Sequence, residues 1–174
     1  GEKIVVRKGK RIPFEAISNV QIELTLSDPS SYVKIEGSSI PPSWKGAVNE
    51  ILSKKECREI LVIGGIDSGK TSLCTYLANM ALDVKYKIAL IDGDLGQSDI
   101  GPPGTIGLGF IQEPITDLFY LQPLDAVFLG VTSPARMIDA TLNAIATLKT
   151  KALGMGAEFL IVNTDGWVEG DDAV

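Results

Sequence analysis

The chain has 174 residues, of which 45% are apolar and 22% charged, a composition suited to one globular core plus a small appendage. Its formal charge of −6 argues against broad, non-specific binding of nucleic acid, which requires many Lys and Arg contacts to phosphates. The absence of histidine excludes His-based catalytic triads and His-ligated zinc, so a catalytic base has to be a carboxylate or a rarer group. With neither a membrane-length apolar run nor a signal peptide, the protein is expected to be intracellular.

The first 37 residues differ in pattern from the rest of the chain. Apolar β-formers cluster or alternate between Gly, Pro, Asp and Ser residues, which predicts short antiparallel strands. These strands are expected at residues 4–6, 20–26 and 32–36. The segment has too few apolar residues for an independent core, so we expect a partial N-terminal β domain over residues 1–37. A linker over residues 38–46 and a short helix near residues 44–54 are expected to follow.

From residue 47 to residue 174 the pattern is that of an α/β protein. Strand-like apolar runs alternate with segments of helical periodicity, which predicts a mostly parallel sheet between two layers of helices. The expected strands are residues 61–63, 87–92, 126–131 and 159–163, the expected helices are residues 71–82 and 135–153, and residues 93–108 are expected to be a Gly/Pro-rich loop. Because the chain stops soon after a strand, we expect an α/β core that lacks its C-terminal part.

A glycine-rich loop follows the first of these strands. Its sequence GGIDSGKT has the GxxxxGK[ST] spacing of a P-loop, in which backbone N–H groups surround phosphate oxygens. Lys70 is expected to contact the β- and γ-phosphates and the Thr71 hydroxyl to bind Mg²⁺, where the N-terminus of a helix favours anions. An ordinary Gly-rich turn is the alternative, but the strand, loop and helix occur in the required order. The predicted nucleotide-binding residues are Gly64, Gly65, Ile66, Asp67, Ser68, Gly69, Lys70, Thr71 and Ser72.

Two carboxylates follow the next expected strand. Asp92 and Asp94 are two positions apart, so they share one face if the chain is extended there. A hydrophobic strand that ends in Asp completes the Mg²⁺ shell of P-loop enzymes, so Asp92 is expected to bind the metal. We favour Asp94 as the base that accepts a proton from the attacking hydroxyl, and Gln97 as a residue that orients nucleophile or phosphate. The alternative is that these are turn residues, since Asp-Gly-Asp is common in turns.

Four ordered segments resemble the polynucleotide 5′-hydroxyl kinase family, which includes archaeal polynucleotide kinases and the RNA kinase of the pre-mRNA cleavage factor. They are GGIDSGKT at residues 64–71, DGDLGQ at 92–97, PPGT at 102–105 and NTDGW at 163–167. The resemblance implies a P-loop kinase core between an N-terminal β domain and a C-terminal domain. It also implies transfer of the γ-phosphate of ATP or another triphosphate, with Mg²⁺, to the 5′-hydroxyl of RNA or DNA. RNA-processing proteins are the implied partners.

The resemblance also suggests residues that contact the acceptor. Thr164, Gly166 and Trp167 match the Thr-x-Gly-Trp motif of the family, and Trp167 is suited to stack on a base, although core packing is the alternative. The lid arginines of the family would lie beyond residue 174. Arg136 is a candidate substitute that contacts phosphate, with a helix-terminus role as the alternative.

The combined interpretation is an ATP- and Mg²⁺-dependent polynucleotide 5′-hydroxyl kinase. One alternative is a GTP-binding protein or GTPase of the P-loop class, although residues 163–165 lack the Asn-Lys-x-Asp element that selects guanine. The other alternative is a scaffold in RNA processing whose bound nucleotide only stabilises a complex.

Overall fold

The computed structural model describes residues 4–6, 8–16 and 18–168. By internal contacts the chain divides into two compact units, Gly1–Gly46 and Ala47–Val174. The expected helix is present as α1 (Pro42–Ser53), and its first residue is a proline, which the first position of a helix tolerates well. Among the described residues, no helix is long and apolar enough to span a bilayer.

The strands expected in the first unit are absent from its described residues. No helix or strand precedes α1 there, and the apolar side chains of the three expected segments are exposed, for example Val20 (61%) and Val33 (80%). This prediction is therefore wrong for the residues described. The physical reason is that an alternating apolar pattern forms a strand only where a neighbouring strand and a core take up its backbone and side chains.

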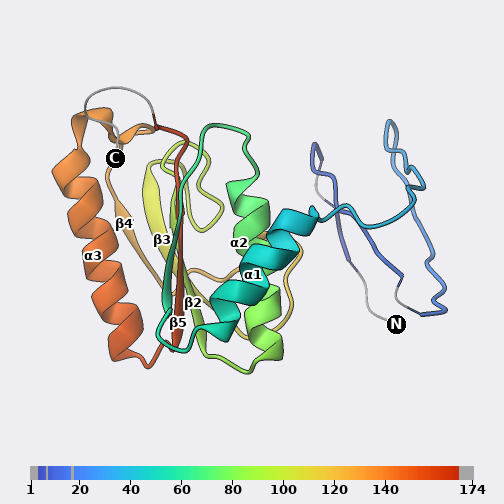
Figure 1. Cartoon of the computed structure of the whole chain (residues 1–174). Helices are drawn as coiled ribbons and strands as arrows, with labels where there is room; N and C mark the ends of the chain where they lie inside the picture. The colour runs from blue at the N-terminus through green and yellow to red at the C-terminus, as the bar shows by residue number, and fades with distance from the viewer. Residues whose placement is uncertain (1–3, 7, 17, 169–174) are drawn as a thin grey trace. The chain divides into compact units, whose positions relative to one another are not determined.

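A mixed sheet lies at the centre of the described part of the second unit (Figure 1). Its five strands are β1 (Glu59–Val62), β2 (Ile88–Gly93), β3 (Thr105–Ile111), β4 (Asp125–Phe128) and β5 (Phe159–Thr164), in the order β1-β5-β2-β3-β4. Both β1 and β2 pair in parallel with β5, whereas β3 pairs antiparallel with β2 and with β4. All strands except β3 therefore run in one direction, and the carboxyl ends of β1, β5, β2 and β4 meet at one edge.

Strand β3 occupies part of the segment that was expected to be a loop. Its glycines are needed because neighbouring segments approach the strand closely. A Cβ atom on Gly107 would lie 1.9 Å from the carbonyl oxygen of Ile100, and one on Gly109 would lie 2.6 Å from Cδ2 of Leu121. The glycines that indicated a loop in the sequence are thus sites of tight packing within a strand.

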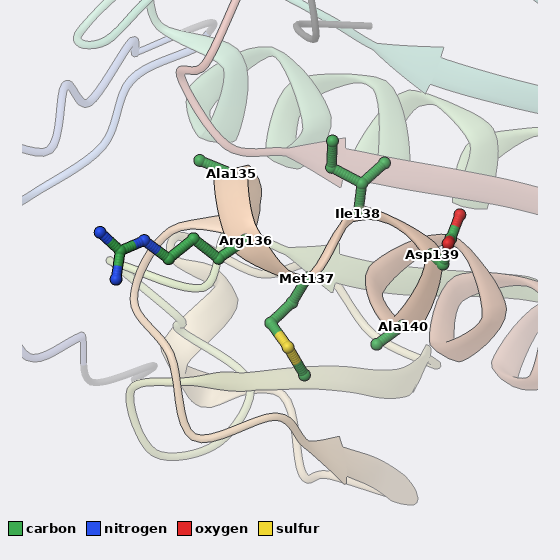
Figure 2. A pocket seen from close by; sticks show the side chains of 6 residues that line it. All are labelled: Ala135, Arg136, Met137, Ile138, Asp139 and Ala140. Carbon is green, nitrogen blue, oxygen red and sulfur yellow. The ribbon is translucent and has the colours of Figure 1, made fainter.

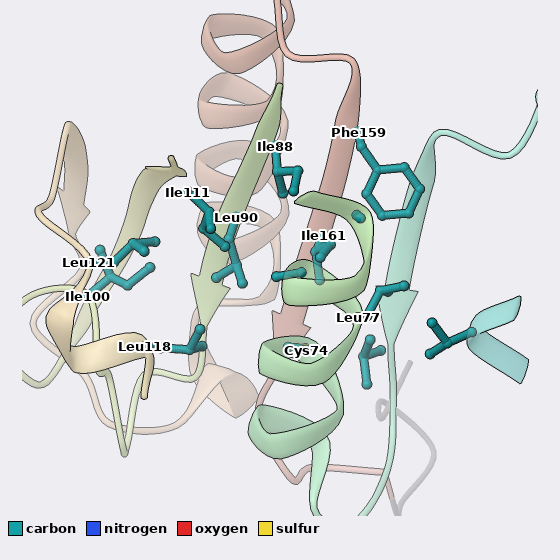
Figure 3. Close-up of a cluster of buried hydrophobic side chains, with 14 residues drawn as sticks. Cys74, Leu77, Ile88, Leu90, Ile100, Ile111, Leu118, Leu121, Phe159 and Ile161 are labelled. Atoms are coloured by element: carbon teal, nitrogen blue, oxygen red, sulfur yellow. The ribbon is translucent and has the colours of Figure 1, made fainter. Parts of the chain in front are cut away.

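Helices cover both faces of the sheet, which confirms the predicted three-layer α/β architecture (Figure 1). On one face, α2 (Lys70–Asp83) packs its buried side chains against β2 and β5, as Figure 3 shows for Leu77, Leu90 and Ile161. On the other face, Leu148 of α3 (Ile138–Gly154) lies in a second buried cluster with residues of the same strands. Strand β2 is buried along its whole length, so the sheet positions its carboxyl end rigidly.

Candidate functional site

The polar residues expected to bind nucleotide and metal lie at the edge where the parallel strands end. The P-loop follows β1, Asp92 and Asp94 stand at the end of β2, and the NTDGW segment lies at the end of β5. Because β5 lies between β1 and β2, its last residues lie between the P-loop and the two carboxylates. The strand order thus brings three separate sequence motifs into one site.

The P-loop has the backbone conformation and the lysine position that a phosphate site requires. Gly69 has φ 90°, in the left-handed region that glycine adopts readily, and α2 begins at the next residue without a side-chain cap on its first turn. A Cβ on Gly64 would lie 2.7 Å from Oγ of Ser68, so a larger residue there would require the Ser68 hydroxyl to move. The Lys70 side chain is buried, and its Nζ donates to the carbonyl oxygen of Gly65 at 2.9 Å. The ammonium group therefore folds back over the loop, and the uncapped N–H groups of α2 suit phosphate oxygens.

The Asp92 carboxylate is fully buried and accepts four hydrogen bonds. Oδ1 accepts from the backbone N–H of Asp94 at 3.3 Å and from Nδ2 of Asn163 at 3.0 Å, and Oδ2 accepts from the N–H of Asp99 at 2.7 Å and of Ile100 at 3.3 Å. Burial raises the pKa of Asp92, while the hydrogen bond from Asn163 and the three backbone bonds oppose this shift. These bonds hold the carboxylate in one orientation.

Asn163 was not among the predicted site residues, yet it connects the P-loop helix to Asp92. Its Nδ2 lies 3.5 Å from Oγ1 of Thr71 and donates to Asp92, and its Oδ1 accepts from the thiol of Cys74 at 3.7 Å. Burial raises the pKa of Cys74 to about 12, so this thiol keeps its proton and acts as a donor. The amide thereby places the Thr71 hydroxyl and the Asp92 carboxylate side by side. A signal existed, since a polar residue ends an otherwise apolar strand, but the sequence does not show which strands flank it.

The oxygen donors of Thr71 and Asp92 fit a magnesium ion. Mg²⁺ prefers one or two protein oxygens and completes its shell with water and phosphate oxygens. The described residues contain no cluster of three or more His, Cys, Asp or Glu side chains that could hold a metal without such help. A hydroxyl and one carboxylate beside a phosphate loop are thus a donor set for a nucleotide-bound Mg²⁺.

Asp94 is half-buried and shapes the loop that follows β2. Its Oδ1 accepts the backbone N–H groups of Gly96 at 3.1 Å and Gln97 at 2.9 Å, and neither bond uses Oδ2. Gln97 is exposed, and its contact with Asp94 is made by the main chain. Asp94 therefore differs from Asp92 in having one oxygen outside these backbone bonds and in being accessible to solvent.

Asp165 is a second residue that sequence reasoning missed. Its Oδ1 accepts the backbone N–H of Trp167 at 3.1 Å. Burial raises the pKa of Asp165, the N–H of Trp167 lowers it, the negative charge of Asp94 raises it, and the positive charge of Lys70 lowers it. Asp165 therefore belongs to the same electrostatic environment as Asp94 and the P-loop lysine. Asp165 occupies the unspecified position of the Thr-x-Gly-Trp motif, so the motif did not single it out.

The three predicted residues of the Thr-x-Gly-Trp motif lie beside the P-loop. The Thr164 hydroxyl donates to the carbonyl oxygen of Val62 at 2.9 Å and so connects the ends of β5 and β1. A Cβ on Gly166 would lie 2.4 Å from Cγ1 and 2.8 Å from the backbone nitrogen of Ile66, so this glycine permits close packing against the P-loop. Trp167 is half-buried at the same edge. These contacts show where the three residues lie in the fold. Their contacts with an acceptor stay predictions.

Arg136 lies apart from this group, in the short 3₁₀ helix η2 (Pro134–Arg136) that precedes α3. It is exposed and lines a shallow hollow of about 400 Å³ formed by six consecutive residues, 135–140 (Figure 2). Within the described residues, no hydrogen bond or ion pair joins Arg136 to the P-loop or to the carboxylates. Since β4 ends at the same edge as β2, Arg136 flanks the site without entering it.

Comparison with known proteins identifies the family. Residues 64–173 match the family described as the P-loop of mRNA cleavage and polyadenylation factor CLP1. The chain belongs to this family. This membership confirms the resemblance found from the four motifs, which include the P-loop, the carboxylates and the NTDGW segment.

Relatives with curated names extend the comparison. The chain is 34% identical over 136 residues to a polyribonucleotide 5′-hydroxyl-kinase of Methanocaldococcus jannaschii, covering 78% of the chain and 37% of that protein. It is 33% identical over 132 residues to one of Pyrococcus furiosus, covering 75% and 37% respectively. A CLP1 homolog of Culex quinquefasciatus is 28% identical over 196 residues, covering 98% of the chain and 45% of the relative. The chain therefore spans less than half the length of these relatives.

Solved structures of Clp1p with Pcf11p have the same fold. One of them is described as the extended interface between Pcf11p and Clp1p and the structural basis for ATP loss in a point mutant. It matches with a TM-score of 0.60 and 22% sequence identity, and the match covers 75% of this chain and 37% of the other. The wild-type complex matches with a TM-score of 0.58 and 20% identity over 75% and 36% respectively. The predicted P-loop fold is thereby confirmed.

Proposed function

We propose that the protein transfers the γ-phosphate of ATP, with Mg²⁺, to the 5′-hydroxyl end of RNA or DNA. The observation that carries this proposal is the Asn163 amide, which joins Thr71 of the P-loop helix to the buried Asp92. This contact supports a phosphate loop and a pair of metal donors acting together at one point of the sheet edge. The kinase names of the two archaeal relatives support phosphoryl transfer to a polynucleotide as the reaction.

In this proposal the P-loop and Lys70 hold the triphosphate tail, because the uncapped N–H groups of α2 and the ammonium group carry the required positive potential. Thr71 and Asp92 would hold Mg²⁺, with Asn163 keeping both donors oriented. When bound, Mg²⁺ neutralises negative charge on the transferring phosphoryl group. These residues supply position and charge, which is most of what phosphoryl transfer demands from a protein.

Asp94 is the residue we propose as the general base. The base has to be reached by the acceptor hydroxyl: Asp92 is fully buried, whereas Asp94 is accessible to solvent and its two backbone bonds use only Oδ1. Asp94 Oδ2 accepts the proton of the 5′-hydroxyl as its oxygen forms a bond to the γ-phosphorus. The bond from that phosphorus to the bridging oxygen breaks, and ADP leaves. The 5′-hydroxyl becomes a 5′-phosphate.

The test is label transfer from γ-labelled ATP by the complete gene product. The acceptors are matched RNA and DNA oligonucleotides with a 5′-hydroxyl, and the same oligonucleotides with a 5′-phosphate serve as controls. We expect label only on the 5′-hydroxyl ends, and competition with unlabelled GTP shows which triphosphate is used. Tight ATP binding without label on any 5′-hydroxyl end would contradict the proposal.

That contradictory result would favour a nucleotide-bound scaffold. The observation in favour of this second candidate is that the structural neighbours are Clp1p in complex with Pcf11p. An RNA-processing protein as partner is accordingly part of the proposal. Turnover by the intact protein separates the kinase from the scaffold, because a scaffold binds ATP without consuming it.

A further inference from the structure

Asp165 is a charged residue of the site to which the proposed function assigns no role. It directly follows Thr164, the last residue of β5, just as Asp94 directly follows Gly93, the last residue of β2. Gly93 and Thr164 are partners in the parallel ladder, and neighbouring strands lie about 4.8 Å apart, so the two aspartates leave the sheet side by side. Because β5 separates β1 from β2, Asp165 lies between the P-loop and Asp94 along this edge.

The backbone on both sides of Asp165 is fixed to β1 and the P-loop. The Thr164 hydroxyl donates to the carbonyl oxygen of Val62 at 2.9 Å. On the other side, a Cβ on Gly166 would lie 2.8 Å from the backbone nitrogen of Ile66, so the two segments pack without a side chain between them. Asp165 is thus held beside the phosphate loop by contacts that do not involve its own side chain.

The half-buried carboxylate of Asp165 has one oxygen engaged and one open. Oδ1 accepts the backbone N–H of Trp167 at 3.1 Å, and no hydrogen bond among the described residues uses Oδ2. Burial is the largest cause that raises the pKa of Asp165, and the negative charge of Asp94 raises it further, whereas the positive charge of Lys70 lowers it. The carboxylate is therefore close enough to the proposed base and to the P-loop lysine to interact with both charges.

A fixed negative charge at this position acts differently on a polynucleotide end before and after transfer. In the proposed reaction the acceptor enters with a neutral 5′-hydroxyl and leaves with a 5′-phosphate, which carries a charge of about −1.5 to −2 at pH 7. Like charges a few ångströms apart repel each other even in water, whereas a hydroxyl is not repelled by a carboxylate and can donate to it. A repulsive element of this kind is one of the two ways in which a site discriminates between ligands.

We infer that Asp165 is a specificity residue for the acceptor end, whose negative charge disfavours a 5′-phosphorylated end relative to a 5′-hydroxyl end. The inference rests on the proposed function, since it concerns the acceptor of that reaction. Asp94 has the same sign of charge, but its removal would also remove the proposed base. Asp165 is the residue at which discrimination can be separated from proton transfer, because no step of the reaction is assigned to it.

The test is equilibrium binding of two 3′-labelled single-stranded RNA decanucleotides to the full-length protein at pH 8, followed by fluorescence anisotropy. The two strands are identical except that one has a 5′-hydroxyl and the other a 5′-phosphate. Saturating ADP occupies the P-loop, so that the 5′-phosphate does not bind there, and EDTA prevents transfer in either direction. The isosteric Asp165→Asn variant keeps an oxygen for the Trp167 N–H and removes only the charge. It is expected to bind the phosphorylated strand about threefold or more tighter than the wild type does, and to bind the hydroxyl strand equally well.

Two variants provide matched controls. Asp165→Glu keeps the negative charge at the same position and is expected to keep the wild-type ratio of the two Kd values. Asp83→Asn removes the charge of the exposed last residue of α2, a helix of 14 residues that begins at Lys70. This length places Asp83 about 20 Å from the P-loop, beyond the Debye length of about 8 Å at physiological ionic strength. The Asp83 variant is therefore also expected to keep the wild-type ratio.

An unchanged Kd ratio in Asp165→Asn would overturn the inference, and so would an equal change in Asp83→Asn. Weaker binding of both strands by Asp165→Asn would overturn it as well, since Asp165 would then act only through the turn at Trp167. A wild-type protein that binds neither strand would contradict an acceptor site altogether. Binding is measured without turnover, so the expected change in ratio together with no label transfer from γ-labelled ATP would refute only the kinase reaction.

Discussion

Asn163 shows how a single amide can organise a site that two other residues occupy. Its Nδ2 donates to the buried Asp92 carboxylate and lies within 3.5 Å of the Thr71 hydroxyl, while the Cys74 thiol fixes its oxygen. A carboxylate that is 0% exposed depends on such donors, because an unsatisfied buried charge is unstable. In the proposed function, Asn163 is therefore a positioning residue for the two groups that would bind Mg²⁺.

Replacing Asn163 with leucine is expected to destabilise the protein by about 1–3 kcal/mol, because Asp92 loses a buried hydrogen bond without a substitute. Urea unfolding of the nucleotide-free protein measures this change. Asn143→Leu on the exposed surface of α3 is the matched control, expected within about 0.5 kcal/mol of the wild type. Equal stabilities of the two variants would contradict the role assigned to Asn163.

Asp165 makes stability depend on pH in a defined direction. Burial and the negative charge of Asp94 raise the folded-state pKa of Asp165 above its unfolded value, against the opposing N–H of Trp167. A raised carboxyl pKa contributes stability below the unfolded value, and this contribution is lost as pH rises through the folded value. Asp165→Asn keeps a side-chain oxygen that accepts the Trp167 N–H but cannot titrate. The free energy of unfolding of this variant is therefore expected to fall less steeply than that of the wild type as pH rises above about 4. Unfolding free energies measured from pH 4 to pH 7 test this, and an unchanged slope would refute it.

Among the elements, the β5 end and the P-loop act as one packed unit. Thr164 donates to the carbonyl oxygen of Val62, and Gly166 lies directly against the backbone of Ile66. The nucleotide loop is thus supported by a segment about a hundred residues later in the chain. This contact was not evident from the motif, in which glycine and threonine were assigned to the acceptor.

The variant Gly166→Ala is expected to disturb the P-loop, because its Cβ would overlap the Ile66 backbone. Such overpacking costs about 1–3 kcal/mol, and ATP affinity is expected to fall by about fivefold or more. Calorimetric titration with ATP measures the effect. Gly154→Ala at the end of α3, where a Cβ meets nothing within 4 Å, should leave ATP affinity unchanged. An equally small effect of both substitutions would show that the β5 end does not support the loop.

The sequence predicted those elements whose signals are local. The strand, glycine loop and helix around Lys70 occur in consecutive residues, so motif spacing alone was sufficient for β1, the P-loop and α2. Strand β3 was missed, since its glycines reflect contacts with Ile100 and Leu121 that no local pattern reveals. Asn163 and Asp165 were missed for a related reason, because their roles follow from the insertion of β5 between β1 and β2.

At the scale of the whole molecule, the proposed function has to be reconciled with a chain of acidic net charge. The formal charge is −6, and the basic groups near the site are Lys70 in the P-loop and Arg136 beyond β4. In this part of the protein, the arrangement supports the proposed binding of a triphosphate and one strand end. The relatives are more than twice as long as the part they share with this chain, so activity is to be measured on the complete gene product.

The most direct test of the account compares label transfer from γ-labelled ATP to a 5′-hydroxyl oligonucleotide by the full-length wild type and by Lys70→Ala. The substitution removes the ammonium group that folds over the P-loop, and Lys55→Ala controls for the loss of one positive charge. We predict that the wild type and the Lys55 variant transfer label and that Lys70→Ala does not. Transfer by Lys70→Ala at the wild-type rate would contradict the placement of the triphosphate in this loop.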